Sequence, residues 1–388
     1  MQWIEKHIKT AENICINYTG SLPLQHELKN YFSKNKKHGS RDRKIISHLC
    51  YTYFRLGKAL LSLSFRERLL VALFLCEENI DKWSSLFNKD YIEQHSDSLE
   101  DRIAFIQKKY KAFSLEDVFA FHDHIGGIDK KAFVQSVFAQ PLTYLRTRPG
   151  TNEKVIAALE NNGITFFEIE KNTLALRQGA HLQDVIKLNK DAVIQDLSSQ
   201  KTAMFFTLTN KDQIKAVWDC CAASGGKTIL AYDYFRPTKM MMSDIRESII
   251  ANLKKRLKEA GVPYQKVFIA DLTQPIDIDE KFDLVICDAP CTGSGTWARM
   301  PEQLSYFKEE KINEYALRQS AIMEHIYPHI ASGGYLFYIT CSVFELENES
   351  RISFLQERFP DLQRVQSGYI IGYHTKADTM YAALLKKD

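Results

Sequence analysis

From about residue 201 onward, short apolar runs alternate with amphipathic segments, and this alternation limits the possible folds more than any other feature. Five runs are expected to be successive strands: Val217–Cys220, Met240–Asp244, Val267–Asp271, Leu284–Asp288 and Leu336–Thr340. Between the second and third, apolar residues at helical spacing predict a helix that stops at Gly261. Buried strands that alternate with helices are typical of a doubly wound, mostly parallel α/β sheet. The apolar run Met380–Leu385 predicts a last antiparallel edge strand.

The preceding residues predict two further domains. Residues 1–135 show helical spacing of apolar side chains almost throughout, and residues 136–200 mix strand and helix patterns as a small α/β connector. In that connector we expect strands at 143–147, 164–169 and 174–176, and a helix at 152–162 that is ended by Gly163. The third domain is then 201–388. At 388 residues the chain is long enough for several cores.

The charge distribution indicates a polyanionic partner for the first domain. Residues 1–70 hold thirteen Lys or Arg against five Asp or Glu. A solvated helix end explains such a run equally well. The residues predicted to bind nucleic acid here are Lys34, Lys36, Lys37, Arg41 and Arg43.

Cysteine spacing and hydropathy exclude other classes. The eight cysteines show no Cys-x-x-Cys spacing, so we predict reduced thiols, no disulfide framework and no metal site. No stretch approaches the roughly 18 apolar residues of a membrane span. We therefore expect a cytoplasmic, monomeric protein with no membrane partner.

Two cysteines follow two of the predicted strands. Cys291 comes after Asp288-Ala289-Pro290, and Cys341 comes directly after Thr340. Ligands of open α/β sheets bind at the carboxyl ends of the strands, so both thiols are expected at one edge of one site. Because a thiolate is a strong nucleophile near neutral pH, this pair predicts attack on an electrophile.

A glycine-rich turn, Asp219–Thr228, follows the first strand and predicts a cofactor loop. Its Gly-Lys-Thr does not fit a Walker A motif, because Cys221 stands where that motif has its first Gly, and no Gly-x-Gly-x-x-Gly is present. Three strands end in Asp244, Asp271 and Asp288. Each carboxylate is explained equally well as a helix N-cap, but together they favour an adenosine-containing ligand without a phosphate chain. S-adenosylmethionine fits that description, with Asp244 on the ribose hydroxyls and Asp271 on the adenine amino group.

Three motifs occur in order: Cys221-Ala222-Ala223-Ser224-Gly225-Gly226-Lys227, Asp288-Ala289-Pro290-Cys291 and Thr340-Cys341-Ser342. With them the chain resembles the S-adenosylmethionine-dependent RNA cytosine-C5 methyltransferases, most closely their bacterial ribosomal-RNA branch, the Sun or Fmu proteins. The resemblance implies a Rossmann-like class I methyltransferase domain with a seven-stranded sheet. It also implies an all-α NusB-like RNA-binding domain before it, for which Ser40-Arg41-Asp42-Arg43 ahead of an apolar helix is the cue.

The resemblance assigns roles to individual residues. Cys341 is implied to attack carbon 6 of cytosine, Asp288 to bind the base near N3, and Cys291 to assist loss of the carbon 5 proton and product release. The target base must be single-stranded or extruded. The implied cofactor contacts are Cys221, Ala222, Ala223, Ser224, Gly225, Gly226, Lys227, Asp244, Asp271 and Asp288. Arg299, in a basic segment near the active site, is expected to meet RNA phosphate, and a solvated loop Arg is equally consistent.

The expected activity is 5-methylcytidine formation in RNA, with small-subunit ribosomal RNA as the substrate. Transfer RNA is an alternative substrate, since relatives of the same catalytic domain act there. A ribosome assembly factor with weak or no catalysis is the alternative of another class. Its only support is Ser224, which replaces the proline usual in the cofactor loop.

Overall fold

The computed structural model describes residues 2–388, which fall into two compact units. The helical unit comprises the chain up to Pro141 together with Thr296–Glu309. The α/β unit comprises Leu142–Gly295 and Glu310–Asp388. The predicted connector, 136–200, falls almost wholly within the α/β unit, and the chain returns once from that unit to the helical one. None of the helices within residues 2–388 is long and apolar enough to cross a membrane.

The helical unit confirms the helical prediction for the first part of the chain. Its helix α4 begins with a capping box, in which the Ser64 side chain accepts from the backbone N–H of Glu67 while the Glu67 carboxylate accepts from that of Ser64. This helix is apolar on nearly all sides and lies in the core of the unit. The helices are α1 (Gln2–Asn17), α2 (Leu24–Lys34), α3 (Ser40–Phe54), α4 (Phe65–Cys76), α5 (Lys89–Gln94), α6 (Leu99–Lys109), α7 (Leu115–Val118), α8 (Lys130–Ser136) and α13 (Gln303–Tyr306).

The Thr296–Glu309 segment completes the core of the helical unit. The Trp297 side chain is fully buried, and its ring centroid lies 5.4 Å from that of Phe119 and 5.8 Å from that of Phe121. Buried Glu302 accepts a hydrogen bond of 3.1 Å from the backbone N–H of Leu24. The first domain therefore includes residues that are distant in the sequence.

A small antiparallel sheet opens the α/β unit, with strand order β2-β3-β1-β4. Its elements are β1 (Thr143–Thr147), α9 (Asn152–Asn161), β2 (Phe166–Glu170), β3 (Thr173–Leu176) and β4 (Ala192–Ile194). The strand predicted at 143–147 is confirmed with the same bounds, whereas β4 was not predicted as a strand. Three residues are too short a run for an alternating pattern to stand out.

The main sheet has seven strands in the order β10-β11-β9-β8-β5-β6-β7, which confirms the predicted class. The five strands from β9 to β7 run parallel, while β11 and β10 pair antiparallel. One detail of the prediction was wrong: β11 lies between β9 and β10 rather than at the edge. The edge strand β10 escaped notice because most of its side chains are exposed or half-buried, so it lacks an apolar run. The bounds are β5 (Ala216–Asp219), β6 (Lys239–Asp244), β7 (Lys266–Ile269), β8 (Phe282–Asp288), β9 (Ile330–Thr340), β10 (Leu362–Ile370) and β11 (Met380–Lys387).

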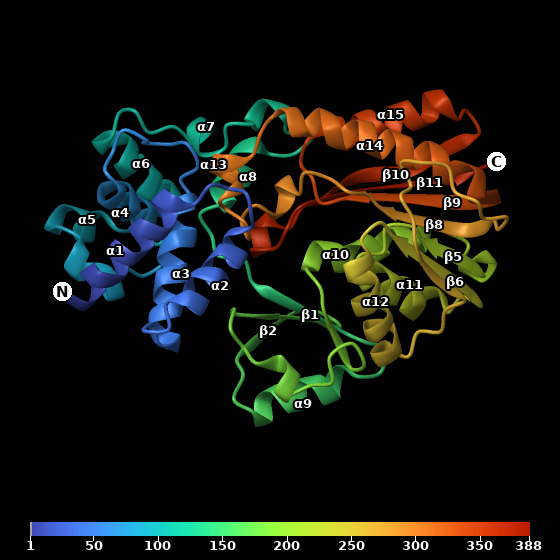
Figure 1. Cartoon of the computed structure of the whole chain (residues 1–388), viewed down its shortest axis with the longest axis horizontal. Helices are drawn as coiled ribbons and strands as arrows, with labels where there is room; N and C mark the ends of the chain where they lie inside the picture. The colour runs from blue at the N-terminus through green and yellow to red at the C-terminus, as the bar shows by residue number, and fades with distance from the viewer. Residues whose placement is uncertain (1) are drawn as a thin grey trace. The chain divides into compact units, whose positions relative to one another are not determined.

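Helices cover both faces of this sheet, as Figure 1 shows. One face packs against α11 (Gly226–Phe235) and α12 (Glu247–Ala260), with Ile229 and Leu253 in the shared core. The other face packs against α14 (Glu310–Ile326) and α15 (Glu349–Arg358), with Met323 and Leu355. The remaining α-helix, α10 (Leu197–Lys201), leads into the sheet. Gly261 ends α12 in a left-handed conformation (φ 62°), as predicted.

Candidate active site

The two predicted strand-end cysteines meet in the structure. The Sγ atoms of Cys291 and Cys341 lie 3.3 Å apart, and both side chains are half-buried. Cys291 lies just beyond β8 and Cys341 just beyond the neighbouring strand β9. The hydrogen bond with Cys341 and burial together raise the pKa of the Cys291 thiol above its ordinary value. Cys291 is therefore protonated at neutral pH, and its Sγ lies within hydrogen-bonding distance of the Cys341 sulfur.

A buried carboxylate, Glu347, links the two cysteine loops. It accepts hydrogen bonds from the Thr292 backbone N–H (2.9 Å) and Thr292 hydroxyl (2.6 Å), and from the Ser342 hydroxyl. Gln319 on α14 donates to Glu347 Oε1 (3.1 Å) and to the Pro290 carbonyl (3.0 Å). Thr292 follows Cys291 and Ser342 follows Cys341. Glu347 thus hydrogen-bonds the residue that follows each thiol. The sequence analysis did not select it; the acidic run 345–349 was the only signal.

Gly295 joins the same two loops by a close backbone approach. Its N–H donates to the Cys341 carbonyl (2.9 Å), and its own carbonyl accepts from the Thr379 N–H (3.0 Å). A Cβ at this position would lie 1.9 Å from the Thr379 carbonyl oxygen. Any residue with a side chain would clash with that carbonyl, so this position requires glycine.

Asp288, at the end of β8, pairs with Lys227 of the cofactor loop. The Lys227 Nζ lies 2.9 Å from Asp288 Oδ2, and the lysine side chain is buried. This ion pair connects the first helix turn of α11 with the strand that leads to Cys291. The structure therefore joins two sequence motifs that lie 61 residues apart.

The cofactor loop wraps over the ends of β5 and β6. The Ala222 N–H bonds the Ser243 carbonyl, and the Ala223 N–H bonds Asp244 Oδ2, both at 2.9 Å. Gly225 is the N-cap of α11 with φ 86°, and a Cβ there would lie 2.6 Å from Leu253 Cδ1. The loop residues Cys221 to Lys227 thus lie at the ends of the parallel strands, as the sequence predicted.

The three aspartates predicted at strand ends have different surroundings. Asp244 accepts from the Ala223 N–H and from the backbone and guanidinium of Arg246. Although burial raises its pKa, the Arg246 hydrogen bonds hold the pKa of Asp244 below the ordinary value. Asp271 is exposed just beyond β7 and accepts from the Thr273 N–H and hydroxyl, which lowers its pKa.

Asp219, which the sequence analysis left out of the site, is fully buried at the end of β5. Its Oδ2 accepts from the Thr228 hydroxyl at 2.6 Å, while its Oδ1 has no hydrogen-bond partner among the described residues. Burial, the largest effect, raises the pKa of Asp219 to about 7. A buried acceptor without a partner is unusual and indicates a missing donor. Its position directly before the glycine-rich turn was the signal in the sequence.

Ser224 replaces a proline of the family pattern, and its side chain has a partner. The Arg256 guanidinium on α12 donates to the Ser224 hydroxyl (2.6 Å) and to the Ser224 carbonyl (2.8 Å). A proline at this position would keep only the carbonyl contact. The hydroxyl therefore offers a different way to restrain the loop.

The predicted RNA-binding residues divide between segments of the helical unit. Lys34, Lys36, Lys37, Arg41 and Arg43 are exposed around the turn from α2 to α3. The guanidinium of Arg41 lies 5.2 Å from the Trp3 ring centroid, and that of Arg43 lies 5.7 Å from the Phe32 ring centroid. Arg299 is half-buried in the Thr296–Glu309 segment, and so belongs to the helical unit rather than to the unit that carries the thiols.

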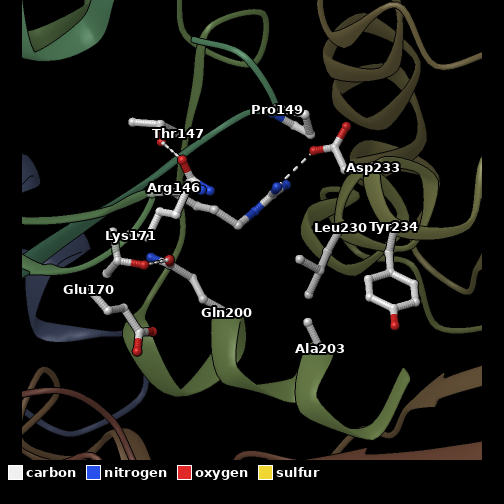
Figure 2. A pocket seen from close by; sticks show the side chains of 12 residues that line it. Arg146, Thr147, Pro149, Glu170, Lys171, Gln200, Ala203, Leu230, Asp233 and Tyr234 are labelled. Carbon is white, nitrogen blue, oxygen red and sulfur yellow. Dashed lines mark hydrogen bonds and ion pairs between the residues drawn. The ribbon is translucent and has the colours of Figure 1, made fainter. Parts of the chain in front are cut away.

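A separate cavity of about 260 Å³ lies in the α/β unit and contains none of the predicted site residues (Figure 2). Arg146 of β1 and Asp233 of α11 line it and pair at 2.7 Å. Arg148, which is not part of the lining, pairs with the same carboxylate. Arg146 also donates to Gln195 at 2.9 Å. These buried contacts attach the small sheet to the main domain.

A known family matches the C-terminal part of the chain. Residues 203–383 match the family model described as 16S rRNA methyltransferase RsmB/F. The chain therefore carries an RsmB/F-family methyltransferase domain. The resemblance inferred from the motifs is confirmed.

Curated relatives that this chain matches carry one name. Ribosomal RNA small subunit methyltransferase B of Enterobacter sp. strain 638 is 30% identical over 236 residues, covering 59% of this chain and 54% of that protein. The protein of the same name from Proteus mirabilis is 28% identical over 242 residues, covering 61% and 56%. The chain spans about half the length of the curated relatives it matches.

Solved structures support the fold of this chain. The crystal structure of PH0851 has a TM-score of 0.71 at 20% identity and covers 98% of both chains. NSun6 from Pyrococcus horikoshii, solved with SFG, has a TM-score of 0.58 at 16% identity and covers 69% of this chain and 96% of that one. At these identities the likeness concerns the fold.

Proposed function

We propose that this protein transfers a methyl group from S-adenosylmethionine to carbon 5 of a cytidine in RNA, and that the RNA is small-subunit ribosomal RNA. The observation that carries the proposal is the thiol pair Cys291 and Cys341, 3.3 Å apart beside the cofactor loop of an RsmB/F-family domain. Two adjacent thiols at the ends of neighbouring parallel strands suit a reaction with one covalent and one proton-transfer step.

The cofactor loop fits S-adenosylmethionine. The unpartnered Oδ1 of buried Asp219 suits the ammonium of its methionine part, since that group donates hydrogen bonds and carries a positive charge. Asp244 and Asp271 follow successive strands and suit the ribose hydroxyls and the adenine amino group. When bound, S-adenosylmethionine supplies the electrophilic methyl group.

Cys341 is the proposed nucleophile. Its thiolate adds to carbon 6 of cytosine, which makes carbon 5 electron-rich enough to accept a methyl cation equivalent. Cys291, whose pKa is raised above its ordinary value, keeps its proton while the Cys341 sulfur attacks. The two cysteines are chemically unequal for this reason.

Cys291 is proposed to complete the reaction. The hydrogen bond with Cys341 is the largest cause of its raised pKa, and this cause is removed once the Cys341 sulfur is bonded to carbon. Cys291 can then release its own proton to solvent, and the resulting thiolate accepts the proton that carbon 5 must lose. As that proton leaves, the bond between carbon 6 and sulfur breaks and Cys341 returns as a thiolate.

Asp288 is proposed to bind the target base. Its carboxylate is held by Lys227 at 2.9 Å and stands between the cofactor loop and the Cys291 loop. A carboxylate at that position can accept a hydrogen bond from the amino group of cytosine, and from N3 once N3 is protonated as the adduct forms. Lys227 offsets its charge, so the pair remains in place in a partly dry site.

The choice of ribosomal RNA rests on the relatives, which are named ribosomal RNA small subunit methyltransferases. The exposed basic residues at the turn from α2 to α3 suit phosphate contacts in the same RNA. We further propose that the protein acts as a monomer in the cytoplasm, where the ribosomal subunits are assembled.

The test is methyl transfer by the full-length protein with labelled S-adenosylmethionine, offered small-subunit ribosomal RNA and transfer RNA in parallel, with bisulfite sequencing of the products. The expected result is a 5-methylcytidine in ribosomal RNA that is absent with Cys341→Ala. If 5-methylcytidine formed only in transfer RNA, the proposal that ribosomal RNA is the substrate would be wrong. Binding of RNA without methylation would support an assembly factor instead.

A further inference from the structure

Three cysteines outside the reacting pair form a cluster beneath the cofactor loop. The Sγ atoms of Cys220, Cys221 and Cys287 all lie within 4.8 Å of one another. Cys220 and Cys287 are fully buried, while Cys221 is half-buried. Cys220 and Cys287 have no part in the proposed reaction, and Cys221 belongs to the loop that is proposed to hold the cofactor.

The sheet register brings these thiols together. β5 and β8 are parallel neighbours in which Asp219 is paired with Ile286, so the next residues, Cys220 and Cys287, also lie side by side. Both side chains point to the sheet face that packs against α14 and α15. Cys221 follows Cys220 at the start of the cofactor loop and packs against the same core. The absence of Cys-x-x-Cys spacing, which led us to predict no metal site, is therefore uninformative here.

The sulfur contacts distinguish this cluster from ordinary packing. An isolated buried cysteine behaves as a small apolar side chain surrounded by carbon. Here three sulfur atoms lie within 4.8 Å of one another. Asp219 directly precedes Cys220 and Asp288 directly follows Cys287, so carboxylates flank the cluster and favour a cation.

We propose that Cys220, Cys221 and Cys287 bind a zinc ion through three thiolates, with a solvent molecule as the fourth ligand. Zn²⁺ accepts three protein ligands and one water in tetrahedral geometry, and thiolates are among its preferred ligands. Binding converts three thiols to thiolates and releases three protons, which leaves one net negative charge on the site. A copper(I) ion would leave two beside Asp288, so zinc is favoured.

The ion has a route to the site and an effect on the fold. Half-buried Cys221 lies on the solvent side of the cluster and provides the position for the water ligand. Because Cys221 belongs to the cofactor loop and Cys287 to β8, the ion ties the loop to the central strand. The ion takes no step in the methyl transfer proposed above, although Cys221 belongs to the cofactor loop.

The test uses the reduced full-length protein without oxygen, titrated with Co²⁺ as a spectroscopic probe and then with Zn²⁺. We expect one Co²⁺ per chain, with thiolate-to-cobalt charge-transfer absorption and tetrahedral d–d bands that Zn²⁺ abolishes. Cys220→Ser and Cys287→Ser each lose the absorption. Cys76→Ser and Cys291→Ser, which lie outside the cluster, keep it.

Three outcomes overturn the proposal. These are no charge-transfer band in the unmodified protein, a band that persists in both Cys220→Ser and Cys287→Ser, or a band lost in Cys291→Ser, which would place the ion on the reacting pair. Circular dichroism establishes that each variant is folded. Where a serine variant does not fold, Cys220→Ala and Cys287→Ala replace it. Methyl transfer is not a readout, so failure here leaves the proposed function standing.

Discussion

At the residue level, the positions of the two thiols that are proposed to react depend on the Glu347 carboxylate, which hydrogen-bonds neither of them. Glu347 receives donors from the residues next to Cys291 and Cys341, and burial raises the pKa of Glu347 above its ordinary value. It is a positioning residue, because its contacts are with Thr292, Ser342 and Gln319.

Glu347→Ala should remove the acceptor that is shared by the Thr292 backbone N–H, the Thr292 and Ser342 hydroxyls and the Gln319 amide. We expect a loss of stability of about 2 kcal/mol or more, and a fall in kcat of about tenfold to a hundredfold from misplaced thiols. Isothermal calorimetry should find the affinity for S-adenosylmethionine nearly unchanged. Glu347→Gln, which keeps one acceptor oxygen, should recover part of kcat. Equal activity of Glu347→Ala and the unmodified protein would contradict the positioning role.

Cys291→Ala should accumulate a covalent complex between Cys341 and RNA. Without the second thiol the carbon 5 proton is not removed, so the bond between carbon 6 and sulfur persists. A denaturing gel with labelled RNA should show a slow band that is absent in the Cys291→Ala, Cys341→Ala double variant. If the single variant turns over normally and no band forms, Cys291 has no part in release.

Asp219 should couple cofactor binding to pH. Its pKa of about 7 lies above the unfolded value, so the folded protein holds an extra proton between about pH 4 and 7, and this group's contribution to stability falls as pH rises through that range. An ammonium at Oδ1 requires the ionised form. Calorimetry in buffers of different ionisation enthalpy should detect release of close to one proton per S-adenosylmethionine below pH 6. Asp219→Asn should abolish the release and weaken binding.

At the scale of secondary structure, the cofactor loop depends on how β5 enters α11. The loop turns sharply at Gly225, where a positive φ and contact with Leu253 on α12 coincide. The loop and α12 are further linked by Arg256 and Ser224. The conformation of the cofactor loop and the packing of α12 therefore depend on each other.

Gly225→Ala should weaken cofactor binding through this turn. The left-handed φ alone costs about 1–2 kcal/mol, and the overlap with Leu253 adds to it. Gly261→Ala is the matched control, because its φ is also positive but a Cβ there would meet nothing within 4 Å. Thermal unfolding should rank Gly225→Ala below Gly261→Ala, with a raised Kd for S-adenosylmethionine only in the former. Equal behaviour would mean that the Leu253 contact is unimportant.

At the level of the whole molecule, the two units are not two consecutive segments of the chain, because each unit is built from two separate segments. The chain leaves the α/β unit at Gly295, supplies Trp297 and Glu302 to the helical core, and returns at Glu310. Arg55 of the helical unit donates to the Ala298 carbonyl at 2.9 Å. The domain boundaries that the sequence predicts at residues 135 and 200 remain a prediction.

Trp297→Ala should destabilise the helical unit in particular. Removing a fully buried Trp costs about 3–5 kcal/mol, and its neighbours Phe119 and Phe121 belong to that unit. Native-state hydrogen exchange should show faster exchange in α7 and α8, while β5 and β8 stay protected. Leu317→Ala, at a residue that is 71% exposed, is the control. Uniform loss of protection in both units would show that they unfold together.

From the sequence alone came the α/β class, the five parallel strands, and the position of Cys291, Cys341 and the glycine-rich loop at the ends of those strands. Each of these is encoded locally: a buried strand needs a continuous apolar run, and the site residues stand directly after those runs. The tertiary structure alone decided that β11 is interior, that Thr296–Glu309 belongs to the helical core, and that Glu347 connects the thiol loops. It also decided that Cys220, Cys221 and Cys287 are neighbours. The reason is physical, because these features depend on strand pairing and on contacts between segments distant in the chain, which leave no periodic pattern in the residues that make them.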